Sequence, residues 1–214
     1  MDPSEVTMSQ DEAVLSIRHE GAIAHLEFNR PAKRNAVNDA TMDALKAFFS
    51  DVPAGVRAVV LSGRGGHFSA GLDLSEQVRR EPQAVMRHSR NWHGVMANIR
   101  SSGVPVVAAM SGAVMGGGLE IASVCHVRVA ERGTMFRMPE GQRGIFVGGG
   151  ATVHLAAIIG ADRLTEMMLT GRTYSAEEGE RLGLVHYLAP SGGAVDKAFE
   201  LARQIASNSA TINY

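Results

Sequence analysis

Short apolar runs of strand length alternate along the chain with longer segments whose apolar residues have helical spacing. The runs over 57–61 and 104–110 have the continuous apolar character of strands buried on both faces. The segments over 39–49 and 83–101 place apolar side chains on one face of a helix. Strands that alternate with helices in this way predict the α/β fold class.

The same alternation continues in both directions. Residues 13–28 form two alternating runs on either side of Glu20-Gly21, a pattern typical of a β-hairpin. Further along, the pattern predicts a helix that begins near 116, strands over 126–131 and 134–139, helices over 150–159 and 161–169, a short helix over 175–182, a strand over 185–189 and a last helix from 194 to about 206.

Composition divides the chain into three segments. Residues 1–11 form a polar, acidic tail, and residues 12–190 hold most of the predicted elements. The last predicted helix falls in 191–214, after a Gly- and Pro-containing stretch over 190–194 that predicts a hinge. We therefore expect one core domain over 12–190, followed by the start of a helical segment.

Composition also narrows the class of protein. Of 214 residues 45% are hydrophobic, enough for a dry core, and the net charge of −1 provides no general attraction for nucleic acid or an acidic membrane surface. The one cysteine, Cys125, excludes an intrachain disulfide; with the absence of a secretory signal, this leads us to expect a cytoplasmic protein. The longest stretch of low charge, 103–119, contains Pro105 and several glycines, so we expect no membrane span.

The common catalytic and metal-binding motifs do not match this sequence. The chain has no GxxxxGK[ST] and no complete GxGxxG pattern, and Ser69 lacks the GxSxG spacing of a nucleophile elbow. His88 and His93 are five residues apart, which does not place them on one face of a helix. We therefore expect no metal site.

Two glycine-rich loops follow buried strands, at 69–74 and 115–120. Glycines just before a helix expose backbone N–H groups at the positive end of the helix dipole, where they bind an anion or the charge that develops on a carbonyl oxygen. If the first loop directs a second N–H to the same point, the pair forms an oxyanion hole. The alternative is that these glycines only permit tight turns or close packing.

Glu120 and Glu140 are the candidate acid–base groups. Glu120 lies among apolar residues in the first turn of the helix that follows Gly117, where the helix dipole alone also favours a carboxylate. Glu140 follows a predicted strand and precedes further glycines. Two carboxyl groups at one site divide acid and base work when their environments separate their pKa values. The spacing leaves open whether these two meet.

Five blocks of the sequence resemble the enoyl-CoA hydratase/isomerase family, the crotonases, in the family's order over about 12–190. They are EFNRPAKRNAV (27–37), FSAGLDL (68–74), PVVAAMSGAVMGGGLEIASVCHVRVA (105–130), FRMPEGQRGIFVGGGA (136–151) and LTGRTYSAEEGERLGLVHYLAP (169–190). The resemblance implies a crotonase-like spiral of repeated ββα units, with the C-terminal helical region largely absent from this chain. It also implies a homotrimer or a dimer of trimers.

The resemblance implies a CoA thioester as substrate and no separate cofactor, because CoA is part of the substrate. By motif, the thioester oxygen would bind the backbone N–H groups of Leu72 and Gly117 as it becomes an enolate. Lys33 would lie near the nucleotide, and backbone atoms of Ala70 and Leu74 would line the pantetheine path. From the residues alone, Lys33 is a solvated loop charge.

Hydratases of this family carry both glutamates, at the positions that match Glu120 and Glu140. The resemblance therefore implies syn hydration of a 2-enoyl-CoA, in which Glu120 activates the water and Glu140 delivers a proton to C2. The alternatives are another crotonase reaction, such as double-bond isomerisation, C–C cleavage or hydrolysis, and a catalytically silent acyl-CoA binder.

The sequence departs from the family pattern beside the expected acyl pocket. The run 146–150 stands where many hydratases have a Pro-Gly pair, and His154 stands where Arg or Gln is common, so no acyl preference is implied. Trp92 and His93 are either contacts of the acyl tail or, respectively, a core anchor and a solvated helix residue.

Overall fold

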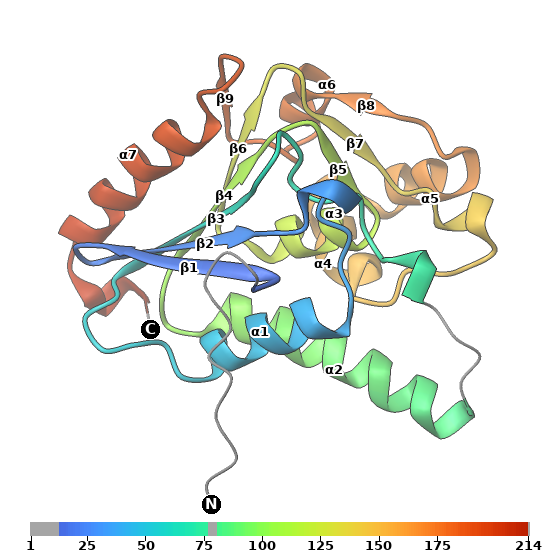
Figure 1. Cartoon of the computed structure of the whole chain (residues 1–214). Helices are drawn as coiled ribbons and strands as arrows, with labels where there is room; N and C mark the ends of the chain where they lie inside the picture. The colour runs from blue at the N-terminus through green and yellow to red at the C-terminus, as the bar shows by residue number, and fades with distance from the viewer. Residues whose placement is uncertain (1–12, 77–80, 214) are drawn as a thin grey trace, which may run out of the picture.

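The computed structural model describes residues 13–76 and 81–213, so the expected tail over 1–11 lies outside the described residues (Figure 1). Its larger sheet has six strands, with the first pair antiparallel and every later pair parallel. In spatial order these are β1 (Leu15–Glu20), β2 (Ile23–Phe28), β3 (Ala58–Gly63), β4 (Val106–Met110), β6 (Val127–Glu131) and β9 (Tyr187–Ala189).

A smaller sheet joins β5 (Ala113–Met115), β7 (Met135–Arg137) and β8 (Tyr174–Ser175). The α-helices of the described residues are α1 (Asp39–Ser50), α2 (Pro82–Ser101), α3 (Gly117–Val124), α4 (Ala151–Ile159), α5 (Ala161–Thr170), α6 (Ala176–Arg181) and α7 (Ala194–Ser207). Four 3₁₀ turns complete them: η1 (Pro31–Lys33), η2 (Leu74–Glu76), η3 (Glu140–Arg143) and η4 (Ala210–Asn213). The α/β class and the hairpin around Glu20-Gly21 are confirmed.

The larger sheet separates two apolar layers, because successive side chains of each strand point to opposite faces. One face packs against α1, α2 and α3, through core residues that include Leu26, Leu61 and Ala108. The other face packs against α7, through residues that include Val60 and Val107. Figure 1 shows the sheet between α7 and the pair α1 and α2.

Helix α7 follows the expected hinge at 190–194, and it packs on the sheet. Its residues Ala194, Ala198 and Ala202 are fully buried against β3, β4 and β6. Small side chains let this helix lie close to the strands, so α7 shares an apolar core with the segment before the hinge. The exact domain boundaries stay a prediction.

Two short strands were not predicted from the sequence. β5 has three residues and lies where we expect only a turn between the strand over 104–110 and the next helix. β8 has two residues and lies in an expected loop. Periodicity cannot be recognised over so few residues, whereas the longer expected helices and strands are found within a few residues of their expected bounds.

Asn35 holds together the loops that lead to the glycine-rich segment 69–74. It adopts a left-handed conformation (φ 55°) and is almost fully buried. Its side chain accepts a hydrogen bond from the Arg30 N–H (2.9 Å) and donates to the carbonyl oxygens of Arg64 (2.9 Å) and His67 (2.7 Å). The Ser69 hydroxyl donates to the Asn35 carbonyl (2.7 Å). Asn35 therefore joins the loop after β2 to the loop after β3.

We predict that Asn35→Ala lowers the free energy of unfolding by about 3 kcal/mol. The substitution removes three hydrogen bonds to part-buried backbone groups and places alanine in a left-handed conformation. Asn91→Ala is the matched control, since the Asn91 side chain bonds only to exposed partners on α1, and it should change stability by less than about 0.5 kcal/mol. Urea unfolding of both variants tests this, and equal effects would contradict it.

Candidate functional site

A cavity of about 330 Å³ gathers residues from four parts of the chain. Leu72 comes from the first glycine-rich loop, and Gly117 and Glu120 come from the beginning of α3. The rest of the lining comes from α2 and from the segment after β7: Val85, His88, Ser89, Trp92, Glu140, Ile145, Phe146 and Gly148. The catalytic residues expected from the sequence, Leu72, Gly117, Glu120 and Glu140, all border this one cavity.

Two backbone N–H groups are free at the cavity. Val37 and Leu72 form a parallel bridge in which Val37 donates to Gly71 (2.7 Å) and accepts from Asp73 (2.8 Å), so the Leu72 N–H points away from Val37. Gly117 is the first residue of α3, where backbone N–H groups have no partner within the helix. Among the described residues, neither N–H has a recorded acceptor.

Glycine is required where these two segments meet. A Cβ on Gly71 would lie 2.7 Å from the Met115 carbonyl oxygen and 3.3 Å from the Gly117 nitrogen, and its φ of +89° also suits glycine. A Cβ on Gly117 would lie 2.9 Å from the Trp92 ring and 3.6 Å from the Leu72 nitrogen. These glycines therefore bring two backbone donors together, which is the geometry of an oxyanion hole.

Glu120 is buried on α3, with one carboxylate oxygen anchored to the backbone. Its Oε1 accepts hydrogen bonds from the N–H groups of Gly149 (2.9 Å) and Ala151 (3.0 Å), where α4 begins. Burial raises the pKa of the Glu120 carboxyl above its ordinary value, and the two N–H donors act in the opposite direction. The anchor fixes the carboxyl group, and the N–H donors favour its ionised form.

Glu140 begins η3 and is buried without an equivalent anchor. Its Oε2 has no hydrogen-bond partner among the described residues. Burial raises the pKa of this carboxyl to about 7, and the charge of Glu120 acts in the same direction. The carboxyl group of Glu140 packs against Gly116, which has no side chain; a Cβ there would lie 2.6 Å from Glu140 Oε1. The structure thus brings together the two glutamates that spacing alone could not place.

Three of the expected CoA contacts do not line the cavity: Lys33 of η1, Ala70 and Leu74. Lys33 Nζ forms an ion pair with Asp73 (3.1 Å) and donates to the Ser75 hydroxyl (2.6 Å). The Ala70 N–H donates to the Arg34 carbonyl (2.9 Å), and Leu74 is exposed at the start of η2. Their contact with CoA stays a prediction.

The sequence analysis missed most of the wall that α2 provides. Val85, His88 and Ser89 border the cavity, although the sequence analysis gave them no functional role. Trp92 is both a buried core residue and part of the cavity wall, and His93 is exposed. The helical spacing of 85, 88, 89 and 92 is the signal that could have placed these residues on one face.

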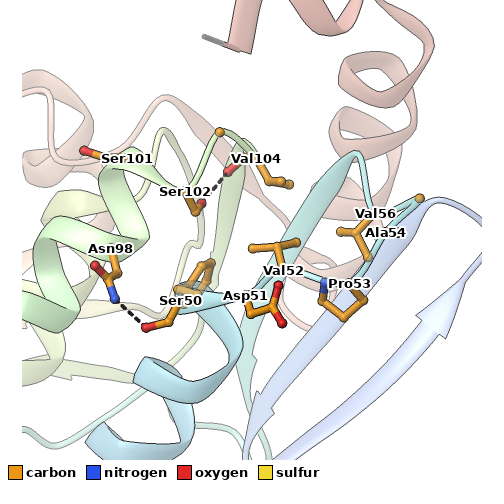
Figure 2. A pocket seen from close by; sticks show the side chains of 13 residues that line it. Ser50, Asp51, Val52, Pro53, Ala54, Val56, Asn98, Ser101, Ser102 and Val104 are labelled. Carbon is orange, nitrogen blue, oxygen red and sulfur yellow. Dashed lines mark hydrogen bonds between the residues drawn. The ribbon is translucent and has the colours of Figure 1, made fainter.

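A larger cleft, of about 630 Å³, lies at the C-terminal ends of α1 and α2 (Figure 2). Its α2 residues, Asn98 and Ser101, lie about 9 to 14 Å along the helix from Trp92. The Asn98 side chain donates to the Ser50 hydroxyl there (2.9 Å), and Asp51 is the only charged residue of the lining. The cleft contains none of the candidate residues, so its size does not make it the candidate site.

Within 13–76 and 81–213, no three His, Cys, Asp or Glu side chains are grouped so that they could hold a metal ion. In the same part of the chain, no helix is long and apolar enough to cross a membrane.

Comparison with known proteins assigns the family. The model of the family described as enoyl-CoA hydratase/isomerase matches residues 18–213. The 2,3-dehydroadipyl-CoA hydratase of Escherichia coli (strain K12) is 31% identical over 96% of this chain and 77% of its own length. The crystal structure of a protein provisionally named enoyl-CoA hydratase, from Rhodopseudomonas palustris CGA009, is 50% identical with a TM-score of 0.91, over 94% of this chain and 78% of that one.

The chain therefore belongs to the enoyl-CoA hydratase/isomerase family, and its fold is crotonase-like, as the sequence motifs predict. Some relatives are much longer. The alpha subunit of the fatty acid oxidation complex of Shewanella frigidimarina (strain NCIMB 400) is 34% identical over 92% of this chain, which spans 29% of that subunit.

The raised pKa of Glu140 predicts a pH-dependent loss of stability. The unfolded carboxyl loses its proton near pH 4.5, whereas the folded protein keeps it until about pH 7. Between these values the folded state binds more protons than the unfolded state, so the free energy of unfolding falls as pH rises and levels off above about pH 7.

Glu140→Gln removes this contribution, and we expect it to raise stability relative to wild type by roughly 2 kcal/mol more at pH 8 than at pH 5. Glu180→Gln, on the exposed end of α6, is the control and should follow wild type at both pH values. Urea unfolding at the two pH values measures the difference. Parallel behaviour of wild type and Glu140→Gln would exclude a raised pKa at this residue.

Proposed function

We propose that this chain adds water across the double bond of a 2-enoyl-CoA. The observation that carries the proposal is the single cavity bordered by two backbone N–H donors and two buried carboxyl groups. The donors suit a thioester oxygen that gains negative charge, and the carboxyl groups suit the transfer of two protons. The names of the hydratase relatives support the same reaction.

In the proposed reaction, the thioester oxygen binds the N–H groups of Leu72 and Gly117. Glu120, as a carboxylate, takes a proton from water while the water oxygen forms a bond to C3. The π electrons of the C2–C3 bond move toward the thioester oxygen and give an enolate, which the two N–H groups stabilise. Glu140 then donates its proton to C2, so the product contains the elements of one water molecule.

The environments of the two glutamates suit these roles. Two backbone N–H donors favour the ionised form of Glu120, as a base requires. Oε2 of Glu140 has no hydrogen-bond partner among the described residues, and the pKa of this carboxyl is about 7, so it holds a proton to donate near neutral pH. Solvent returns the proton from Glu120 to Glu140 between turnovers.

The proposal also includes the CoA contacts and the oligomeric state that the family resemblance implies, and the location expected from the sequence. Lys33 and the backbone of Ala70 and Leu74 would contact the nucleotide and pantetheine parts of CoA. CoA would enter as part of the substrate, with no separate cofactor. A homotrimer or dimer of trimers, and a cytoplasmic location, stay predictions.

We predict that Glu120→Gln and Glu140→Gln each lower kcat for hydration of crotonyl-CoA by about 10²–10⁴-fold, which is the range expected for acid–base residues. Glu180→Gln should keep the wild-type rate. Mass spectrometry of products formed in ¹⁸O-labelled water identifies the added oxygen. A product with a shifted double bond and no added oxygen would indicate an isomerase, and tight binding without turnover would indicate a silent binder; either result refutes the proposal.

The oxyanion hole is tested at Gly117. A methyl group there would press against the Trp92 ring beside the Leu72 N–H, so Gly117→Ala should lower kcat by about 10²-fold or more. Gly94→Ala is the matched control: Gly94 lies within α2, and a Cβ there meets no heavy atom within 4 Å. Steady-state kinetics on folded variants measures both, and a Gly117→Ala enzyme with wild-type kcat would argue against a role for this N–H.

A further inference from the structure

One wall of the cavity is a face of α2 that carries two polar side chains, and the proposed hydration does not use it. Val85, His88, Ser89 and Trp92 are spaced by three or four residues, so they share one face of the helix, and all four border the cavity. The segment after β7 lines the same cavity with the apolar side chains of Ile145 and Phe146. An acyl group held here meets polar atoms from α2 and apolar atoms from this segment.

The Ser89 hydroxyl is available for a ligand. Among the described residues it has no recorded hydrogen-bond partner, and the side chain is partly exposed at the cavity. Serines within helices often bond to a carbonyl of the preceding turn, as Ser123 of α3 does with Glu120 (2.6 Å). Ser89 lacks that bond, so its oxygen can both donate to and accept from a bound group.

His88 lies one residue earlier and is oriented by a carboxylate. Its Nε2 lies 2.9 Å from Oδ1 of Asp39, the first residue of α1. The Asp39 carboxylate therefore holds the imidazole in place beside Ser89. The carboxyl groups of Glu120 and Glu140 border the same cavity and disfavour a negatively charged group on the ligand there.

We infer that this face of α2 recognises a neutral oxygen-bearing group, a hydroxyl or a carbonyl, on the acyl part of the substrate. A plain alkyl chain would leave the Ser89 hydroxyl without a partner in a partly dehydrated cavity, which costs affinity. The volume of about 330 Å³ is near the lower end for small-molecule sites, so the acyl group is short. The inference rests on the proposed function in taking the cavity as the acyl site.

The test compares two matched substrates, 2-hexenoyl-CoA and 6-hydroxy-2-hexenoyl-CoA. We expect wild type to prefer the hydroxylated substrate by about tenfold in kcat/KM. Ser89→Ala and His88→Phe should each reduce this preference several-fold, because the loss in kcat/KM is larger for the hydroxylated substrate than for 2-hexenoyl-CoA. Ser101→Ala, at the exposed end of the same helix, should keep the wild-type preference.

Equal values for the two substrates in wild type would overturn the inference. So would a Ser89→Ala enzyme that loses activity equally toward both, since that pattern reports general damage. If neither substrate turns over, the proposed hydration fails, and the inference is tested separately by competition binding of hexanoyl-CoA and 6-hydroxyhexanoyl-CoA. Tighter binding of the hydroxylated compound, lost in Ser89→Ala, upholds it, and equal binding overturns it.

Discussion

The close approach of two backbone segments, at Gly71 and at Gly117, is the constraint on which the candidate site depends. A side chain at either position would push against backbone or ring atoms at 2.7–2.9 Å, so only glycine lets the Leu72 and Gly117 N–H groups face one cavity. The rest of the fold maintains this approach. The segment 69–73 is bonded to Val37 on one side and, through Ser69, to β5 on the other, and Asn35 fixes the loops that lead to it.

Burial of two carboxyl groups beside these donors gives the cavity its chemistry. Two backbone N–H groups at the start of α4 anchor Glu120, whereas the same burial leaves Glu140 with an oxygen that has no partner in the described chain. Burial raises the pKa of both carboxyl groups, and the two backbone N–H donors of Gly149 and Ala151 act against this rise only at Glu120. Leaving a buried carboxyl without partners costs stability, and such costs are typical of functional sites.

The sequence predicted most of the fold because its longer strands and helices have clear periodicity. β5 and β8, with three and two residues, are too short to show a period. Both glutamates were predicted as candidates from their local context, but their meeting depends on how η3 and α3 pack, which residue spacing does not encode. The face of α2 that borders the cavity was missed because His88 and Ser89 look like ordinary surface residues until Gly117 and Phe146 are seen to face them across a cavity.

If the Leu72 and Gly117 N–H groups polarise a thioester carbonyl, infrared difference spectroscopy should detect the change in that bond. Butyryl-CoA labelled with ¹³C at the carbonyl binds without a double bond to hydrate, so its C=O stretch reports the bound ground state. We expect a lower stretching frequency for the bound carbonyl than for the free one in wild type, and a return toward the free value in Gly117→Ala. A bound carbonyl in wild type that absorbs at the free frequency would contradict it.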